Sequence, residues 1–543
     1  MTTENTTEHV PPCPNLAKGL SCDPCKDLAA IYQEILAAEA ISSTLLKKRA
    51  KICRRRNHVH DSLTSRLPPE LISRIFIEFL PASVSRSYRI NLNCKKSERT
   101  WTTTPYVLGT VSTGWRAITW STPQLWTSIS IDLAYTSETF VTLLTEWLCR
   151  SGSLCLYVNI YTTEYSALLD ESPLKQISAQ ISNLLARHMS KWCYLQLEVP
   201  SVYFPCICSG IGSVPQLSIL DIRVSGPEHA PIKLESVPNL KRLFIRDFDI
   251  RMVSNIDWKK LTHFNSAFHS IDMVHQLFSN ALFLEHCTFY LLGGLEHNQR
   301  QTTRNTVLRH DHLVFLQMEF WMPGMDTVVE WLEFPALQHL IAYKQTHSLA
   351  DLIRRSSCPL KTLELFVDVK YEDQEVPLIP FVADIPSLEV LRLNDYSNRE
   401  SGRYCIDPLF LQLSEAYIAD TRRPFLPNLE VLDLTLTKFS WISLLDFLVA
   451  NSDSNMRPIM TKQTIDPLDA GLERHDHGFR SLEAMDIRLW NVGAKFPGPD
   501  LDTTRKLLNV IEDISLQIYI ADSYIATSIP FPAFLQQRLS ALQ

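Results

Sequence analysis

The sequence predicts a mixed α/β fold in which a small all-α domain, preceded by an amphipathic helix, is followed by an irregular α/β solenoid. Two observations lead to this prediction. Residues 27 to 126 carry helical periodicity, and from residue 192 onward a short phrase with apolar residues at fixed positions recurs. The composition agrees, because 543 residues with 45% hydrophobic and 20% charged residues belong to the ordinary globular class and can form more than one core.

The charge balance and the chain start exclude several classes of protein. With a formal net charge of −7, the chain lacks the global positive field that holds a phosphate backbone. The start, MTTENTTEHVPPCP, does not resemble a secretory signal, and no apolar run approaches the roughly 18 residues of a membrane span. We therefore expect no nucleic-acid partner, no membrane partner and a cytoplasmic and/or nuclear location. Thiols stay reduced there, so the 13 cysteines are interpreted as small buried apolar residues and not as a disulfide framework.

The first segments are a tail and a helix. Residues 1–26 are rich in Thr, Pro and Glu and are expected to form a disordered N-terminal tail. Residues 27–66 predict an amphipathic, heptad-like helix, because apolar residues follow alternating steps of three and four. This seam contains Leu28, Ile31, Ile35, Ala38, Leu45, Ile52, Val59 and Leu63. The polar residues Ser42, Arg49 and Arg56 fall on the same seam, so we expect the helix to fold against the next segment and not to form a self-sufficient coiled coil.

Residues 67–126 predict a small helical domain. Prolines 68 and 69 end one helix and start another, since proline fits the first turn of a helix but not its interior. The new helix carries a wide apolar stripe that needs a cover, formed by Leu71, Ile72, Ile75, Phe76, Phe79 and Leu80. A second apolar segment supplies part of that cover through Val107, Leu108, Val111, Trp115 and Ile118. The polar insert 82–104 between the two is expected to be a loop.

Together these residues resemble the F-box domain, in the form common in mushroom-type fungi. The F-box pattern begins with Leu-Pro and a helix with acidic and aliphatic residues, continues with a Val and a Trp-Arg pair, and ends near a Pro and a Trp. The matching residues are Leu67, Pro68, Glu70, Leu71, Ile75, Phe76, Val111, Trp115, Arg116, Pro123 and Trp126. The sequence departs from the pattern in its longer polar insert and in Gly114, which stands where a helix former is expected.

The resemblance implies a function and a partner. F-box helices dock onto a small Skp-type adaptor, and through it onto a cullin, in an SCF-type ubiquitin ligase that marks proteins for degradation. The adaptor-binding residues that it implies are Leu67, Pro68, Leu71, Ile75, Phe76, Val111 and Trp115, some of which must instead form the core of the small domain. The alternative is that these helices simply pack on the downstream domain.

Residues 127–543 are expected to be an α/β domain that binds a protein substrate. After two strands and an intervening helix, a phrase of the form apolar-x-x-apolar-x-apolar recurs. Its copies are WCYLQL at 192, LSILDI at 217, LKRLFI at 240, LEHCTF at 284, LVFLQM at 313, LKTLEL at 360, LEVLRL at 388, LEVLDL at 429 and LEAMDI at 482, with weaker copies at Leu261 and Leu337. Up to Leu388 the copies are spaced by 21 to 29 residues.

This spacing resembles that of leucine-rich repeats, in which one strand and its return segment stack on their neighbours. The position expected to hold Asn or Cys instead holds Ser225, Phe248, Leu292, Asp368, Tyr396 or Thr437. We therefore expect an irregular leucine-rich-repeat-like solenoid. Two later gaps, of 41 and 53 residues, are expected to contain a helix near 409–419 and a polar loop near 452–478. A non-solenoid α/β domain is the alternative.

Motifs for catalysis or cofactor binding are missing from the sequence. Only 15 residues are glycine, and no phosphate-binding loop, Gly-x-Ser-x-Gly elbow or His-Glu-x-x-His helix occurs. Cys22 and Cys25 lack the second pair of ligands that a structural zinc site needs. Arg-His-Asp-His occurs at 309–312 and 474–477, and these histidines are interpreted as solvated loop residues. We expect no catalytic residue, no metal and no cofactor.

The sequence therefore favours a non-catalytic substrate receptor of a ubiquitin ligase. Two alternatives stay open: an adaptor-binding scaffold outside ubiquitin transfer, and an enzyme with a dispersed site in the α/β region. The basic run KKRAKICRRR, residues 47–56, is interpreted as the solvated face of a helix, with a nuclear-import signal as the alternative.

Overall fold

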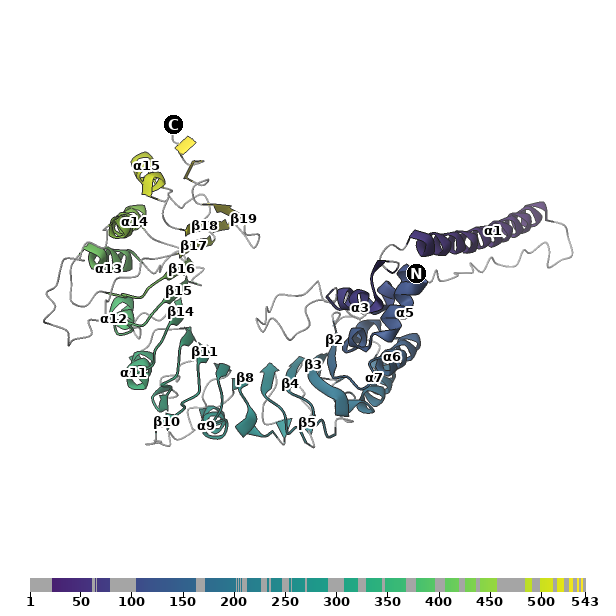
Figure 1. Cartoon of the computed structure of the whole chain (residues 1–543), viewed down its shortest axis with the longest axis horizontal. Helices are drawn as coiled ribbons and strands as arrows, with labels where there is room; N and C mark the ends of the chain where they lie inside the picture. The colour runs from purple at the N-terminus through teal and green to yellow at the C-terminus, as the bar shows by residue number, and fades with distance from the viewer. Residues whose placement is uncertain are drawn as a thin grey trace. The chain divides into compact units, whose positions relative to one another are not determined.

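The computed structural model is a mixed α/β protein, as the sequence predicts, and it contains a large, mainly parallel sheet (Figure 1). The chain divides into two compact units, one with residues 1–130 and 142–156 and one with residues 131–141 and 157–543. We call them unit 1 and unit 2. The residues that the structure describes are 22–60, 64, 66–78, 104–162, 171–201, 203, 205, 207, 212–225, 232–233, 236–246, 253–254, 256–268, 271–291, 307–320, 329–343, 347–367, 377–395, 406–418, 425–435, 440–456, 484–490, 499–510, 515–521, 527–530, 535–536 and 539–540.

Several predicted segments lie outside these residues. They include the tail up to residue 21, the side chains of Phe79 and Leu80, nearly all of the polar insert, most of the loop near 452–478 and the second Arg-His-Asp-His.

Unit 1 is helical. Its elements are α1 (Asp23–His60), α3 (Pro69–Glu78), α4 (Thr104–Val111), α5 (Thr113–Ser121), the short 3-10 helix η3 (Pro123–Trp126) and the main part of α6 (Glu138–Arg150). The Pro68 carbonyl accepts hydrogen bonds from the Leu71 and Ile72 amides, which places Pro69 in the first turn of α3 as predicted.

The helix α1 is one uninterrupted helix of 38 residues (Figure 1). Part of α1 contacts α5 of the following segment, but the apolar side chains along the described helix are not buried by this contact. Its large apolar side chains, from Leu28 to Ile52, are 40 to 66% exposed. The α3–α5 contact is made by Phe76 and Trp115, so it does not use the apolar side chains of α1.

Unit 2 is built on the large sheet. The fifteen strands that the structure describes in it lie in chain order. Neighbouring strands from β3 to β18 are parallel, while β19 is antiparallel to β18. They are β1 (Ser128–Asp132), β2 (Leu156–Tyr161), β3 (Trp192–Pro200), β4 (Ile219–Ser225), β6 (Arg242–Arg246), β8 (His263–Phe268), β9 (His286–Leu291), β11 (Phe315–Phe320), β13 (His339–Ala342), β14 (Thr362–Val367), β15 (Val390–Asp395), β16 (Val431–Thr435), β17 (Ala484–Trp490), β18 (Ser515–Ala521) and β19 (Thr527–Pro530).

The recurring phrase explains the sheet. Each strand from β4 to β17 begins at the third residue of a copy, and the copies align position by position; for example, Leu363 lies beside Leu391 and Leu391 beside Leu432. The first, fourth and sixth residues of the copies at 360, 388 and 429 are almost fully buried. Because successive strand residues point to opposite faces, the fourth and sixth residues form one buried face and the third and fifth form the other, which we call the open face.

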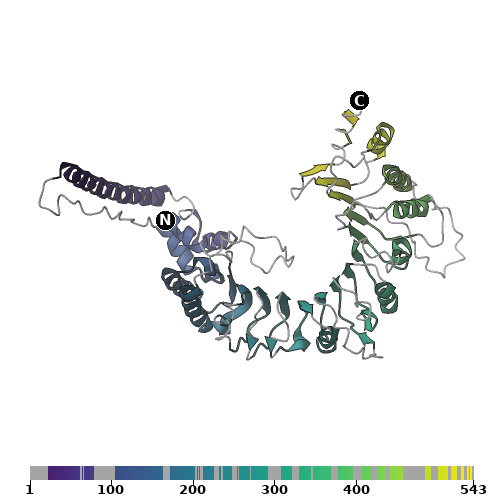
Figure 2. The ribbon, with the colours of Figure 1, turned by 180° about the vertical axis from the view of Figure 1, so that it is seen from behind.

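Helices cover the buried face. Figure 1 shows them along one side of the strands, and Figure 2 shows the same layering from behind. They are α7 (Glu171–Ala186), α9 (Ile271–Asn280), α11 (His347–Ser356), α12 (Leu378–Ala383), α13 (Asp407–Ile418), α14 (Trp441–Met456) and α15 (Leu501–Val510), accompanied by two short parallel strand pairs, β5 (Ile232–Lys233) with β7 (Val253–Ser254) and β10 (Leu308–Arg309) with β12 (Leu332–Glu333). The predicted helix near 409–419 is α13.

Side chains in the loops before the strands link successive copies. The side-chain amides of Asn239 and Asn428 donate to the carbonyls of Pro215 and Pro386, which occupy the preceding loop position one copy earlier. The Lys260 ammonium donates to the Pro238 carbonyl in the same way. These contacts bridge successive copies. They do so although the position that holds Asn or Cys in leucine-rich repeats holds other residues in this chain.

The cysteines differ from the prediction. Cys287 is fully buried on β9, as expected, but Cys149 is exposed and Cys22, Cys25, Cys53 and Cys358 are half-buried. Cys155 and Cys193 are disulfide-bonded, which the sequence analysis does not predict. Among the residues that the structure describes, no helix combines the length and the apolar character that crossing a bilayer requires.

Candidate functional site

The helix α3 divides into a buried and an exposed side. Ile72 and Phe76, four residues apart, are almost completely buried, because residues at this spacing share one helix face. The Phe76 ring lies 4.7 Å from the Trp115 ring of α5, centroid to centroid. The Ser73 and Thr122 hydroxyls, 2.9 Å apart, join α3 to the end of α5. Leu71 lies outside this core and is exposed.

The turn between α4 and α5 is held by side chains. The Ser112 hydroxyl caps α5 by accepting from the Trp115 amide at 3.1 Å, which satisfies an amide that has no partner inside the helix. The Arg116 guanidinium donates to the Gly109 carbonyl of α4 at 2.8 Å. Gly109 is needed where it stands, since an added Cβ would overlap the Trp120 ring.

An aromatic cluster fixes α4, η3 and α6 together. Tyr106, Trp120, Trp126 and Trp147 contact one another at centroid distances of 5.0 to 6.0 Å, mostly edge to face. The Arg150 guanidinium lies 4.5 and 4.8 Å from the Trp120 and Trp126 ring centres. Burial in this cluster raises the pKa of the Tyr106 hydroxyl, although Arg150 opposes the shift, and that hydroxyl donates to the Leu143 carbonyl.

The seven residues of the predicted adaptor-binding set do not share one environment. Pro68, Leu71 and Val111 are exposed, whereas Leu67, Ile75 and Trp115 are half-buried. Phe76 is in the core, so it supports the surface from below and does not form part of it. The helical period explains why neighbouring residues of α3 differ in exposure. The sequence reveals this period but not which side of the apolar stripe is buried.

The exposed large apolar side chains of unit 1 outside α1, among the described residues, are Leu71, Val107, Val111 and Leu143. We call them the exposed apolar set. They lie on α3, α4 and α6, and α5 contacts both α3 and α4. Their side chains are 40 to 57% exposed, whereas the residues beneath them are packed into the aromatic cluster and the α3–α5 contact. Exposed apolar side chains therefore stand on helices whose other sides are packed against one another.

The open face of unit 2 carries a ladder of rings. His263, His286, Phe315 and His339 occupy the same position in β8, β9, β11 and β13. The His263 and His286 rings are stacked at 4.3 Å, and the His286 and Phe315 centroids are 5.6 Å apart. The sequence shows this ladder at the third residue of three phrases, LTH, LEH and LQH, and the prediction overlooked it.

The ladder is uncharged at neutral pH. Partial burial lowers the pKa of the His263 imidazole to about 3, with smaller contributions from Arg242 and His286. Partial burial also lowers the pKa of His286 and of His339. Neutral rings offer a partner flat apolar surface together with hydrogen-bonding nitrogens.

Ion pairs flank the ladder on the open face. Arg392 of β15 lies 3.9 Å from Glu364 of β14 and 3.8 Å from Asp433 of β16. At the other end, Arg246 lies 3.6 Å from Asp221, and burial raises the pKa of the Asp221 carboxyl to about 6 although Arg246 opposes this shift. The charge sign alternates from Glu364 through Arg392 to Asp433, and the Arg246–Asp221 pair also joins both signs, so these described ion pairs do not form a continuous positive surface.

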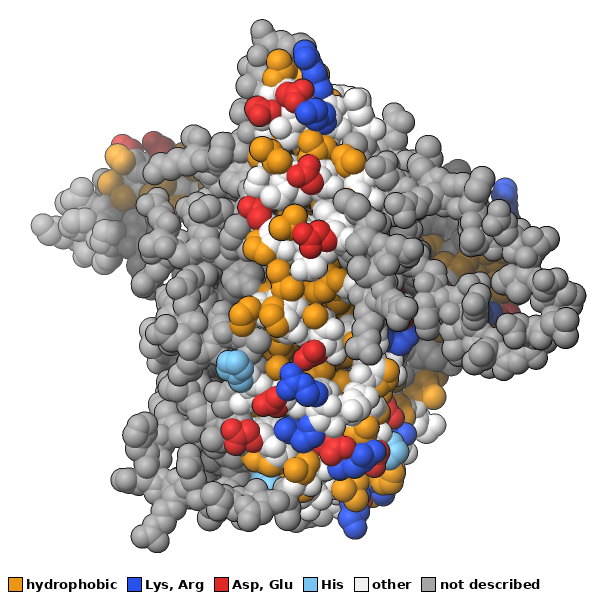
Figure 3. All heavy atoms as spheres, turned by 90° about the vertical axis from the view of Figure 1, so that its left-hand side faces the viewer, with side chains coloured by type: hydrophobic (Ala, Val, Ile, Leu, Met, Phe, Trp, Pro, Cys, Tyr) orange, Lys and Arg blue, Asp and Glu red, His pale blue; other side chains and the backbone are white. Residues whose placement is uncertain are grey.

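The helix-covered side of unit 2 has a mixed surface as well. Figure 3 shows acidic, basic and hydrophobic side chains interspersed in a strip of described residues. Leu411 of α13 and Ile442 of α14 are both exposed there.

The described histidine pair is not a solvated one. His310 follows β10, is only 3% exposed, and its Nε2 atom lies 2.8 Å from the Ala281 carbonyl. The prediction of solvated loop histidines is therefore wrong for His310, while His312 is exposed. Within the residues that the structure describes, no three His, Cys, Asp or Glu side chains gather closely enough to hold a metal ion.

A small pocket is lined in part by Trp192, Leu195 and Leu197 of β3. Its lining is apolar apart from Ser182, whose hydroxyl donates to the Ile207 carbonyl. No titratable side chain faces this pocket, so it gives no support to the enzyme alternative.

Comparison with known proteins adds no relative: no protein-family model matches the chain, and a search of curated proteins returns no match.

Proposed function

We propose that the chain is the substrate-recognition subunit of an SCF-type cullin-RING ubiquitin ligase, with unit 1 as an F-box domain and unit 2 as an irregular leucine-rich-repeat-like receptor. The observation that carries the proposal is the exposed apolar set. Leu71 and Val111 stand on helices in which buried Phe76 contacts half-buried Trp115, and both of these residues occupy positions of the F-box pattern. The chain's own role is binding and not catalysis.

The energetics favour a protein partner on this surface. Full burial of a Leu or Val side chain contributes roughly 1.5 to 3 kcal/mol, so covering residues that are about half exposed contributes roughly 1 kcal/mol each. The helices that carry this surface are held together by ring contacts and a capping bond, so docking orders few side chains and little of this gain is lost to entropy.

The open face of unit 2 suits the second half of the function. It combines the ring ladder from His263 to His339 with the ion pairs around Arg392. Aromatic side chains and arginine are the residues that dominate protein interfaces. A bound protein held there reacts faster with ubiquitin because it is close to a loaded enzyme in the ligase, and proximity alone can supply this gain.

The adaptor part is tested by capture of a purified Skp-type adaptor with the full chain and with Leu71→Asp. We expect the variant to lose capture by at least about tenfold, because an aspartate cannot be buried without a partner. The matched control is Leu282→Asp in unit 2, since Leu282 is 50% exposed and Leu71 is 49% exposed. The control should capture the adaptor as the parent chain does.

The outcomes separate the alternatives. Capture that survives Leu71→Asp contradicts the docking surface. A complex that contains adaptor but no cullin favours a scaffold outside ubiquitin transfer. Adaptor and cullin together, lost jointly in Leu71→Asp, support the receptor.

A further inference from the structure

The long helix α1 is the apolar surface that the proposed function leaves unused. Nine of its described large apolar side chains are exposed. In the heptad written abcdefg, with Leu28 at a, five of them occupy the a and d seam and three more occupy the flanking e and g positions. The five are Leu28, Ile31, Ile35, Leu45 and Ile52, and the three are Tyr32, Ile41 and Leu46. Only Leu36, at b, stands outside.

The charges of α1 are segregated along its length. Residues 23–41 contain four acidic residues and one lysine, whereas residues 42–60 contain seven Lys and Arg residues and no acidic residue. The helix dipole favours such charges only in the terminal turns, so it does not explain basic residues as far inside as Lys47. One half of the helix is therefore complementary in charge to the other half of a second, oppositely directed copy.

We propose that α1 pairs with α1 of a second copy of this chain as an antiparallel two-stranded coiled coil. In an antiparallel pair each a residue faces a d residue of the partner helix. The register that brings Ile35 opposite Ile52 also brings Ser42 opposite Leu45 and Arg49 opposite Ala38, since all these pairs share one centre.

The antiparallel direction accommodates the polar seam residues. Arg49 faces the small Ala38, next to Glu39, which leaves room for the guanidinium beside a carboxylate. At the g positions Glu34 faces Arg55. Of the two seam arginines, Arg49 thus lies beside an acidic residue, whereas Arg56 faces Ile31 in this register.

The parallel direction does not. In a parallel, in-register pair Arg49 faces Arg49 and Arg56 faces Arg56. The flanking g-to-e contact then joins Glu34 to Glu39, two acids, and like charges at these positions oppose pairing. Charge therefore selects the orientation, while the apolar seam supplies the attraction.

Light scattering of the purified full chain at micromolar concentration tests the proposal. We expect twice the chain mass of 62.2 kDa. Ile35→Asp places a carboxylate in the seam and should weaken dimerisation on the order of 100-fold. Leu36→Asp is the matched control, because Leu36 adjoins Ile35 and is similarly exposed, at 56% against 48%, but lies off the seam. It should remain dimeric.

A charge exchange tests the direction. Glu34→Arg alone and Arg55→Glu alone each place like charges at the facing g positions and should weaken the dimer, whereas the double variant should restore it. A monomeric parent chain, a larger assembly, an equal effect of Leu36→Asp, or a double variant no better than the single ones would each overturn the proposal. None of these outcomes depends on adaptor binding, so the proposed function is tested separately.

Discussion

Gly109 shows how a single missing side chain can define a helical contact. The Trp120 ring occupies the space that a Cβ at Gly109 would need, and Trp120 is itself held by Tyr106, Trp126 and Arg150. Alanine would gain about 1 kcal/mol of helix propensity, but displacing a packed ring costs roughly 1 to 3 kcal/mol or more. We expect Gly109→Ala to lower the stability of unit 1 in chemical denaturation followed by tryptophan fluorescence.

Gly114 is the control for that substitution. A Cβ there would lie 3.3 Å from the Thr64 side chain, whose end can rotate away. The propensity gain should then prevail, so Gly114→Ala should leave unit 1 unchanged or slightly more stable. Equal losses at Gly109 and Gly114 would contradict the assignment of Gly109 as the close-approach position.

His263 makes the stability of unit 2 depend on pH. Its pKa is lowered to about 3 by burial, by Arg242 and by His286, against 6.5 for an unfolded histidine. Above pH 6.5 both states are neutral. Below pH 6.5 the unfolded state binds a proton at this histidine, whereas the folded state does not until the pH approaches 3. The free energy of unfolding therefore decreases as the pH falls from 6.5 toward 3, by about 1 kcal/mol per pH unit after allowance for solvent screening.

His263→Phe should keep the ring and remove this loss. Chemical denaturation at pH values between 4 and 7, about one unit apart, measures how the free energy of unfolding changes with pH. This change should be smaller for the variant than for the parent chain. Phe315→Leu changes the ladder without removing a titratable group and should keep the parent slope. A parent-like slope for His263→Phe would show that the acid sensitivity arises elsewhere.

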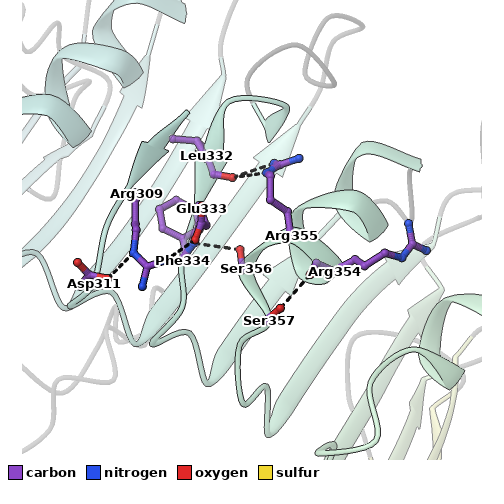
Figure 4. A network of polar contacts seen from close by, with 9 residues as sticks. All are labelled: Arg309, Asp311, Leu332, Glu333, Phe334, Arg354, Arg355, Ser356 and Ser357. Atoms are coloured by element: carbon purple, nitrogen blue, oxygen red, sulfur yellow. Dashed lines mark hydrogen bonds and ion pairs between the residues drawn. The ribbon is translucent and has the colours of Figure 1, made fainter. Parts of the chain in front are cut away.

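At the scale of elements, α11 is fastened by one of two adjacent arginines. The Arg355 guanidinium donates to the Leu332 carbonyl at 2.8 and 3.1 Å (Figure 4). It also donates to the Val329 carbonyl at 2.7 Å. Arg354 instead makes exposed ion pairs with Asp351 and Asp384, and such pairs contribute little. We expect Arg355→Ala to destabilise unit 2 by about 2 kcal/mol, since it strands partly buried carbonyls.

Arg354→Ala is the matched control and should cause no measurable change. Denaturation with urea, monitored by circular dichroism, compares the two variants. If both lost stability equally, helix propensity and not the carbonyl contacts would explain the effect of Arg355.

The strands could be predicted from the sequence, but α14 could not. Each phrase places two buried residues two positions apart, as in Leu363 and Leu365, and this spacing identifies a strand and its buried face. The helix α14, Trp441–Met456, falls in the longest gap, and its sequence WISLLDFLVANSDSNM is apolar on too many sides to show a clear helical stripe. Packing against α13 decides its structure, and no local pattern reports that packing.

The candidate site was predicted in part. Helical spacing identified the α3 stripe, yet it could not separate exposed Leu71 from buried Phe76, because that depends on where α5 lies. The cluster of Tyr106, Trp120 and Trp147 was missed, since it joins segments that are distant in sequence. A concentration of tryptophans between residues 101 and 147 is the signal that was available.

At the scale of the whole sheet, strand order predicts a gradient of protection. Each of β11, β13, β14 and β15 is hydrogen-bonded to a parallel strand on both sides, whereas β19 ends the sheet and pairs only with β18. Amides with one neighbouring strand open more easily. Hydrogen exchange should therefore be slowest in β11 to β15 and clearly faster in β19. Uniform exchange across the strands would show that the sheet opens as one cooperative unit.

Chain length between neighbouring strands has no influence on their alignment. Two connections, from β15 to β16 and from β16 to β17, span 41 and 53 residues from copy to copy instead of 21 to 29, yet Leu393, Leu434 and Ile487 remain side by side. Foreign peptides or fluorescent domains grafted into these two connections should leave the scaffold intact. These two connections are therefore suitable positions for attaching reporter domains or other added proteins.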